Sequence, residues 1–217
     1  MGISFYPPAS GGGGKSFIVE TITSTGTWTC PADVEQVEVI LVGGGGGGTQ
    51  YTPSNLWVMG GAGGDVMHSH LTVTPGATYT ITIGGGGAYY SGNSGSGAPG
   101  LASSFDTLLT AGGGSAGSPS GGGQVWKASY GQGSMVLQTL STSGMSSGMS
   151  YSGLYGLGGH GRGSNDSAGT YPAAGSGATD PAISAAANRG GGGGSSKNVS
   201  SSNGGSGVCI IKYWSAE

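Results

Sequence analysis

The chain has 217 residues, of which 53 are glycine and 33 are serine, and only 7% are charged. Such a composition usually indicates low complexity or disorder, but the Gly-X-Y repeat of a collagen triple helix is absent. The net charge of −3 and the lack of a basic stripe argue against nucleic acid as a partner. No apolar stretch approaches the roughly 20 residues of a membrane helix, so no membrane insertion is expected.

We expect residues 1–16 to form a short N-terminal arm for attachment, with Phe5, Tyr6, Pro7 and Pro8 as its anchors. Residues 9–16, Ala-Ser-Gly-Gly-Gly-Gly-Lys-Ser, resemble a relaxed phosphate-binding loop. That chemistry requires a strand before the loop and a helix after it. Two prolines precede this stretch and the strand-like Phe17-Ile18-Val19 follows it, so we interpret it as a flexible joint. The arm also lacks the features of a signal peptide.

The next residues in the chain are rich in β-branched and aromatic side chains, which favour strands. The clearest case is 78–83, Thr-Tyr-Thr-Ile-Thr-Ile, which alternates polar and apolar residues as a half-buried strand does. Pro75-Gly76 before it predicts a turn. No window has a convincing helical period. The predicted strands are 17–23, 25–29, 34–42, 66–74, 78–83, a weaker one within 102–111, and 208–214.

Residues 111–206 are rich in glycine and poor in aliphatic residues, yet the strand-like Val208-Cys209-Ile210-Ile211 follows them. An unstructured loop of this length is uncommon in a compact domain. Glycine segments can pack side by side as extended helices with three residues per turn, whose free N–H and C=O groups bond to neighbouring segments. We therefore predict an all-β, sandwich or jelly-roll-like framework with a long glycine-rich insertion, packed as polyglycine-II helices and closed by a C-terminal strand.

This interpretation gives the arm, residues 1–16, and one glycine-rich β domain, residues 17–217. Within the domain we expect a strand-rich part at 17–110, a glycine-rich layer with loops at 111–206, and a closing strand at 207–217. Cys30 and Cys209 both lie among strand-like residues, and the sequence leaves open whether they pair.

Candidate chemistry is sparse. His68 and His70 are two residues apart on one strand, a spacing that can bind a metal, but no third ligand is placed by the sequence. We interpret them as polar residues on a solvated face, and we expect no metal and no cofactor. Serine is so abundant that a Ser/His/Asp combination carries no information, and no nucleophile elbow is present. We expect no catalytic residues and no enzymatic activity.

An ordered set of short motifs spans about residues 17–214. Gly26-Thr27-Trp28-Thr29-Cys30-Pro31 is followed by a strand that ends in Gly43–Gly48. Thr74-Pro75-Gly76-Ala77-Thr78-Tyr79 begins a second strand that ends in glycine. Ser103-Ser104-Phe105 and the closing Ile210-Ile211-Lys212-Tyr213-Trp214 complete the set. In this order the motifs resemble the glycine-rich domain of bacteriophage tail-fibre and adhesin proteins.

The resemblance implies a virion structural protein of a tail fibre or spike, located near a fibre tip and contributing to binding of the host surface. We further expect a homotrimer assembled in the host cytoplasm, with the arm docked on another virion protein. The expected host partner is a cell-surface glycan or an outer-membrane protein. The alternative is a purely structural virion part, such as a collar, baseplate or head fibre component, without receptor contact.

Aromatic residues among glycine and serine give the candidate receptor-binding positions, because tyrosine and tryptophan in such loops are typical of recognition surfaces. The alternative role for each ring is to cap glycine helices or to fill subunit interfaces. The candidates are Tyr89, Tyr90, Trp126, Tyr130, Tyr151, Tyr155, His160, Arg162 and Tyr171.

Overall fold

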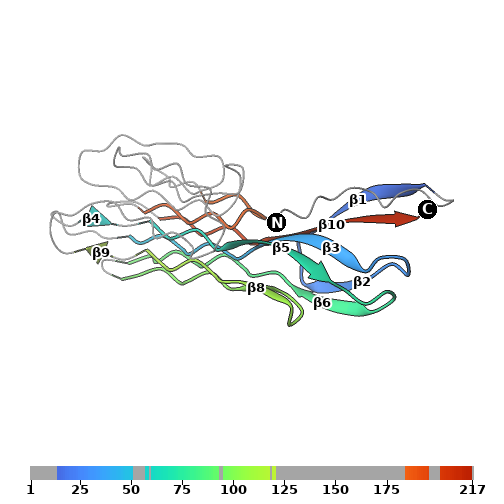
Figure 1. Ribbon diagram of the computed structural model, residues 1–217. Helices are drawn as coiled ribbons and strands as arrows, with labels where there is room; N and C mark the ends of the chain where they lie inside the picture. Colours follow the sequence, from blue (N-terminus) through green and yellow to red (C-terminus); the bar gives the residue numbers. More distant parts are fainter. Residues whose placement is uncertain are drawn as a thin grey trace, which may run out of the picture.

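The structure is a computed structural model of the whole chain. The residues that it describes form two four-stranded antiparallel sheets and the segments that extend from them. The described residues are 14–50, 57–58, 60–92, 95–117, 119–120, 184–195 and 201–216. Figure 1 shows an elongated molecule, with the end of β10 and the start of β1 at one end and β4 and β9 at the other. Within these residues, no helix is long and apolar enough to cross a membrane.

Sheet A has four antiparallel strands in the order β1-β10-β3-β5. They are β1 (Lys15–Ile22), β10 (Val208–Ala216), β3 (Gln36–Val42) and β5 (Val66–Thr72). The C-terminal strand β10 lies between β1 and β3, and Lys15 pairs with Ala216. The chain therefore returns after its glycine-rich stretch to fill a central position in the sheet, as the apolar sequence of β10 predicted.

Sheet B has four shorter antiparallel strands in the order β2-β6-β7-β8. They are β2 (Gly26–Thr29), β6 (Thr78–Thr82), β7 (Ser103–Phe105) and β8 (Leu109–Ala111). The predicted turn before β6 is confirmed, and Gly76 has a φ of 74°, a conformation that a residue with a Cβ adopts only with strain. A separate pair, β4 (Trp57–Val58) with β9 (Pro119–Ser120), was not predicted.

The inner faces of the two sheets form one apolar core, which confirms the predicted all-β, sandwich-like framework. Phe105 on sheet B is fully buried and packs against Trp28 and Tyr79. The sheet A side of the core contains Val37, Val39, Leu41, Cys209, Ile211 and Tyr213. The alternation along β10 follows from the two-residue period of a strand, which sends every second side chain to the core.

A partly buried polar contact links the two sheets at this core. The carboxylate of Glu20 on β1 accepts a hydrogen bond from Trp28 Nε1, at 3.0 Å, and another from the hydroxyl of Tyr213. Burial, followed by the neighbouring Glu20, raises the pKa of Tyr213 to about 12, so the phenol remains a donor throughout the physiological range. Glu20 thus satisfies two aromatic donors that would otherwise be buried without an acceptor.

Candidate functional site

Strands of both sheets continue away from the sandwich as extended glycine-rich segments, which we call the glycine bundle (Figure 1). Its seven segments are 43–48, 60–65, 84–90, 97–101, 112–117, 190–194 and 202–207. Four of them run outward from the sandwich and three return to it. We call the far end, beyond Thr49, the tip.

Segment 43–48 is the centre of the bundle, and its N–H groups donate to three neighbours in strict rotation. Gly43 and Gly46 donate to segment 60–65. Gly44 and Gly47 donate to segment 97–101, and Gly45 and Gly48 donate to segment 202–207. The pairs are Gly43–Asp65, Gly44–Leu101, Gly45–Gly205, Gly46–Ala62, Gly47–Ala98 and Gly48–Ser202, all at 2.8–2.9 Å. This three-residue period is that of a polyproline-II-type helix. Polyglycine-II packing was predicted for residues 111–206, and segments 112–117, 190–194 and 202–206 of that range take part in it, but residues 121–183 lie outside the described residues and four segments come from before residue 111.

The remaining three neighbours of the central segment run parallel to it and donate to its carbonyl groups. Gly87, Gly114 and Gly193 donate to Gly45, Gly44 and Gly46, respectively. The six outer segments also bond to one another in a closed ring, in the order 60–65, 112–117, 97–101, 84–90, 202–207, 190–194 and back to 60–65. Every bond within the ring joins antiparallel segments, so the bundle satisfies backbone groups that a glycine-rich loop would leave to water.

The spacing of this bundle excludes side chains from its interior. A Cβ added to any residue of 43–48 would lie 2.0–2.1 Å from a carbonyl oxygen of one of the three parallel neighbours. The glycines of the central segment are therefore fixed by backbone contact distance. At Gly85, which faces outward, an added Cβ would meet nothing within 4 Å. The requirement for glycine is thus specific to positions that face another segment.

Buried hydroxyl groups close the two ends of the bundle. At the tip, Thr49 donates from Oγ1 to the carbonyl of Gly117 at 2.6 Å, and its N–H donates to Ser195 Oγ at 2.7 Å. At the sandwich end, Ser103 Oγ donates to the carbonyl of Val42 at 2.6 Å and accepts from the N–H of Gly84 at 2.9 Å. Each hydroxyl bonds where the three-residue pattern stops and a strand or loop begins.

Two of the predicted binding residues, Tyr89 and Tyr90, lie at the tip, where segment 84–90 ends. The side chain of Tyr89 is exposed, and its N–H donates to Asn203 Oδ1 at 2.9 Å. The ring of Tyr90 is half-buried and lies against the backbone of Gly92 and Gly95. Both main chains are therefore held by the bundle, and the ring of Tyr89 is the more exposed of the two.

The other predicted binding residues lie outside the described residues. They are Trp126, Tyr130, Tyr151, Tyr155, His160, Arg162 and Tyr171. The predicted attachment residues Phe5, Tyr6, Pro7 and Pro8 also lie outside them. The described residues do place the start of the longest glycine-rich insertion, because segment 112–117 leads outward to β9 at the tip.

His68 and His70 lie on the outer face of sheet A, remote from the tip. Nε2 of His68 lies 2.7 Å from Glu38 Oε1, which also lies 3.0 Å from Lys212 Nζ. Burial, the largest single influence, acts to raise the pKa of Glu38, but the hydrogen bond and charge of Lys212, followed by the contact with His68, hold that pKa below its usual value. No group of three or more metal-binding side chains occurs among the described residues.

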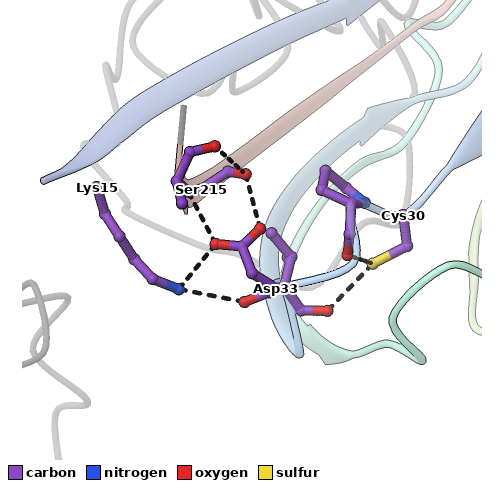
Figure 2. Close-up of polar contacts among 7 residues, drawn as sticks. Lys15, Cys30, Asp33 and Ser215 are labelled. Carbon is purple, nitrogen blue, oxygen red and sulfur yellow. Dashed lines mark hydrogen bonds and ion pairs between the residues drawn. The ribbon is translucent and has the colours of Figure 1, made fainter. Parts of the chain in front are cut away.

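Both cysteines are buried and unpaired. Burial raises the pKa of Cys209 to about 12 and also raises that of Cys30. Cys30 Sγ donates to the carbonyl of Val34 at 3.2 Å, next to the loop that carries Asp33 (Figure 2). Thiols held in their protonated form are poor nucleophiles, which fits the role of small apolar core residues.

The opposite end of the molecule holds both ends of the described chain together. Asp33, in the loop between β2 and β3, accepts from the N–H of Ala216 at 2.8 Å and from Ser215 Oγ at 2.8 Å (Figure 2). Lys15 Nζ lies 3.1 Å from Oδ2 of the same carboxylate. The Ala216 N–H, the Ser215 hydroxyl and Lys15 together hold the pKa of Asp33 at about 2. We call this the terminal end.

Comparison with known families gives one match, to the model of a glycine-rich domain, over residues 18–214. The chain belongs to this glycine-rich domain family. The match covers every segment of the bundle and all of both sheets except the start of β1 and the end of β10, so the sandwich and the bundle both belong to the matched domain. No curated protein matches the chain.

Sequence reasoning did not identify the residues that organise the tip. Thr49 and Ser195 each directly follow a run of glycines. A hydroxyl residue at the end of a glycine run was the sequence feature that could have indicated where a bundle segment ends. The central segment, 43–48, lies within residues 17–110, which were predicted from the composition to be the strand-rich part of the domain. The bundle is therefore assembled from both glycine-rich and strand-rich stretches of the sequence.

Proposed function

We propose that the chain is a bacteriophage virion protein of a tail fibre or spike, and that its tip binds the host surface. The observation that supports the proposal is that the two ends of the elongated molecule differ. The start of β1 and the end of β10 lie together at the terminal end, and the bundle carries β4, β9 and Tyr89 at the other. A protein that attaches at one end and recognises a surface at the other requires this arrangement.

The glycine bundle would serve as a stiff extension that presents loops. Its segments are cross-bonded in a closed ring around a central one, so the positions where loops begin are fixed relative to each other. Loops on a rigid framework are the common location of binding residues. The composition of the insertion after segment 112–117, rich in glycine, serine and tyrosine, is that of adaptable recognition loops.

The proposed partners follow from the chemistry of the exposed residues. An exposed ring such as Tyr89 can stack on a sugar face or on an apolar protein surface, so a host glycan or an outer-membrane protein is the proposed receptor. We propose a homotrimer, in which three tips multiply weak single contacts through valency. The arm residues Phe5, Tyr6, Pro7 and Pro8 would attach the protein to another virion protein. We propose no catalytic step and no cofactor.

Binding of the labelled full chain to bacterial cells tests this proposal. We expect saturable binding that Tyr89→Ser weakens several-fold, because it removes the exposed ring and leaves the main-chain bond to Asn203 in place. Leu108→Ser is the matched control, since Leu108 is also exposed but lies in the turn between β7 and β8.

The position of the protein in an intact particle separates adhesion from a purely structural role. Antibody labelling at a distal fibre tip supports adhesion. Labelling that becomes accessible only after the particle is disrupted, combined with no binding of the isolated chain to cells, would favour a collar, baseplate or head component.

A further inference from the structure

The outer face of sheet A carries an exposed apolar patch near the terminal end. Phe17 and Val19 on the edge strand β1 are 48% and 52% exposed. The centroid of the Phe17 ring lies 5.2 Å from that of Trp214 on β10. Toward the bundle the same face is covered, because Val42 is buried and Gly190 lies against its side chain. We call Phe17, Val19 and Trp214 the outer patch.

The indole nitrogen of Trp214 is buried and lacks a hydrogen-bond partner within the part of the chain that the structure describes. An indole N–H can only donate, and a buried donor without an acceptor is unfavourable. The indole of Trp28 shows the usual arrangement, with Glu20 as its acceptor at 3.0 Å. An acceptor from beyond the described residues would complete the outer patch.

The ring of Phe17 and the indole of Trp214, which also carries the buried donor, form a surface suited to a proline-rich segment. Such segments are preformed as extended polyproline-II helices, dock on aromatic-lined surfaces, and have backbone carbonyls free to accept. Pro7-Pro8 is the one pair of adjacent prolines in this sequence, and Tyr6 precedes it. The segment lies in the arm that leads directly into β1.

We propose that Tyr6-Pro7-Pro8 docks on the outer patch of its own chain, and that a carbonyl of this segment accepts the hydrogen bond of Trp214. The connection is short enough to favour this over a second molecule, because a tethered segment has an effective concentration in the millimolar range. Gly11–Gly14 can reverse the chain between the segment and Lys15. Attachment of the arm to another protein would then compete with this contact.

The indole N–H signals of the full chain, observed by NMR, test the proposal directly. The Trp214 signal is assigned by its loss in Trp214→Phe. In the double variant Pro7→Ala, Pro8→Ala we expect this signal to shift and its hydrogen exchange to become at least about tenfold faster. The Trp28 signal reports on the fold of the same molecule and should not change. Pro99→Ala, which alters an exposed proline of the bundle, is the matched control.

Deletion of residues 2–10 should have the same effect on Trp214 as the double variant. A peptide of residues 1–13, added at millimolar concentration, should reverse it, and a peptide with both prolines replaced by alanine should not. An unchanged Trp214 signal in both variants overturns the proposal. A self-association that Phe17→Asp abolishes and that arm deletion leaves intact would also overturn it, because a second copy would then occupy the outer patch.

Discussion

The sandwich and the glycine bundle are continuous in the chain, but different parts of the polypeptide stabilise them. In the sandwich, side chains such as Phe105 and Leu41 fill the space between two sheets. In the bundle, N–H and C=O groups join segments so closely that no side chain fits between them. The sandwich is thus specified by which apolar residues are present, and the bundle by where side chains are absent.

This difference predicts opposite tolerance to substitution. A packed core accepts apolar replacements of similar volume at modest cost in stability. The bundle interior accepts none, because its contact atoms are backbone and cannot move without breaking hydrogen bonds. Glycine also loses the most conformational freedom on folding, so the bundle depends on its dense bonding to offset that loss.

The largest expected effect is that of Gly46→Ala in the central segment. The added Cβ would lie 2.0 Å from the carbonyl oxygen of Ser115, and the carbonyl group of Gly46 itself accepts from Gly193. We expect a loss of about 4 kcal/mol or more in the free energy of unfolding, or failure to fold. Urea denaturation of the soluble protein, or its recovery on expression, measures the effect.

Gly85→Ala is the control, because the Cβ there meets nothing within 4 Å. It should stabilise the protein by about 0.4–1 kcal/mol through the unfolded state. Gly86→Ala, one residue further, should again be severe, since its Cβ would lie 1.9 Å from the carbonyl oxygen of Gly204. Equal effects at 85 and 86 would show that the backbone packing described for the bundle is wrong.

The second largest effect is expected from Phe105→Ala in the sandwich. Phe105 is fully buried against Trp28 and Tyr79, and its removal should cost about 3–5 kcal/mol. The exposed Leu108→Ala should stay within about 0.5 kcal/mol of the parent. Because strands lead directly into bundle segments, we expect hydrogen exchange to accelerate in both regions. Unchanged protection of the Gly46 amide would instead make the bundle an independent cooperative unit.

The β framework was predictable from sequence because each strand has a local sequence pattern of its own. The alternation of Thr78–Thr82 and the apolar run of β10 predicted both elements and the return of the chain. Packing of glycine as polyglycine II was also predictable, from the strand that follows the glycine-rich stretch. The order of the six outer segments around the central one was not predictable, because a run of glycines has no side-chain pattern that selects one neighbouring segment over another. Nor does the sequence distinguish Tyr89 from Tyr90, although the side chain of Tyr89 is exposed and that of Tyr90 is half-buried.

A smaller effect is expected at the junction of the two regions, from Ser103→Ala. The hydroxyl of Ser103 is buried between the carbonyl of Val42 and the N–H of Gly84, where two strands become bundle segments. Its loss leaves both groups without this partner and should cost about 1–3 kcal/mol. Ser104→Ala, at the adjacent half-buried position, is the control, and equal losses in urea denaturation would contradict the capping role.

The smallest effects are expected from pH, and they should have opposite signs in the two regions. At the terminal end the pKa of Asp33 is lowered to about 2, first by the N–H of Ala216, so its ionised form stabilises the fold. This contribution is complete above the unfolded pKa of about 4 and is lost as pH falls toward 2. Beside the bundle, burial raises the pKa of Asp65 despite a bond from Gly112, so protonation there favours the folded state.

Thermal unfolding of Asp33→Asn and Asp65→Asn between pH 7 and pH 2 separates these contributions. Asp33→Asn should be less stable than the parent at pH 7, and the difference should shrink as the pH falls below about 4. Asp65→Asn should match or exceed the parent at pH 7, since an amide oxygen can still accept from Gly112 without the cost of a buried charge. Parallel pH profiles for the two variants would mean that the carboxylates of the sandwich and the bundle experience the same environment, contrary to their contacts.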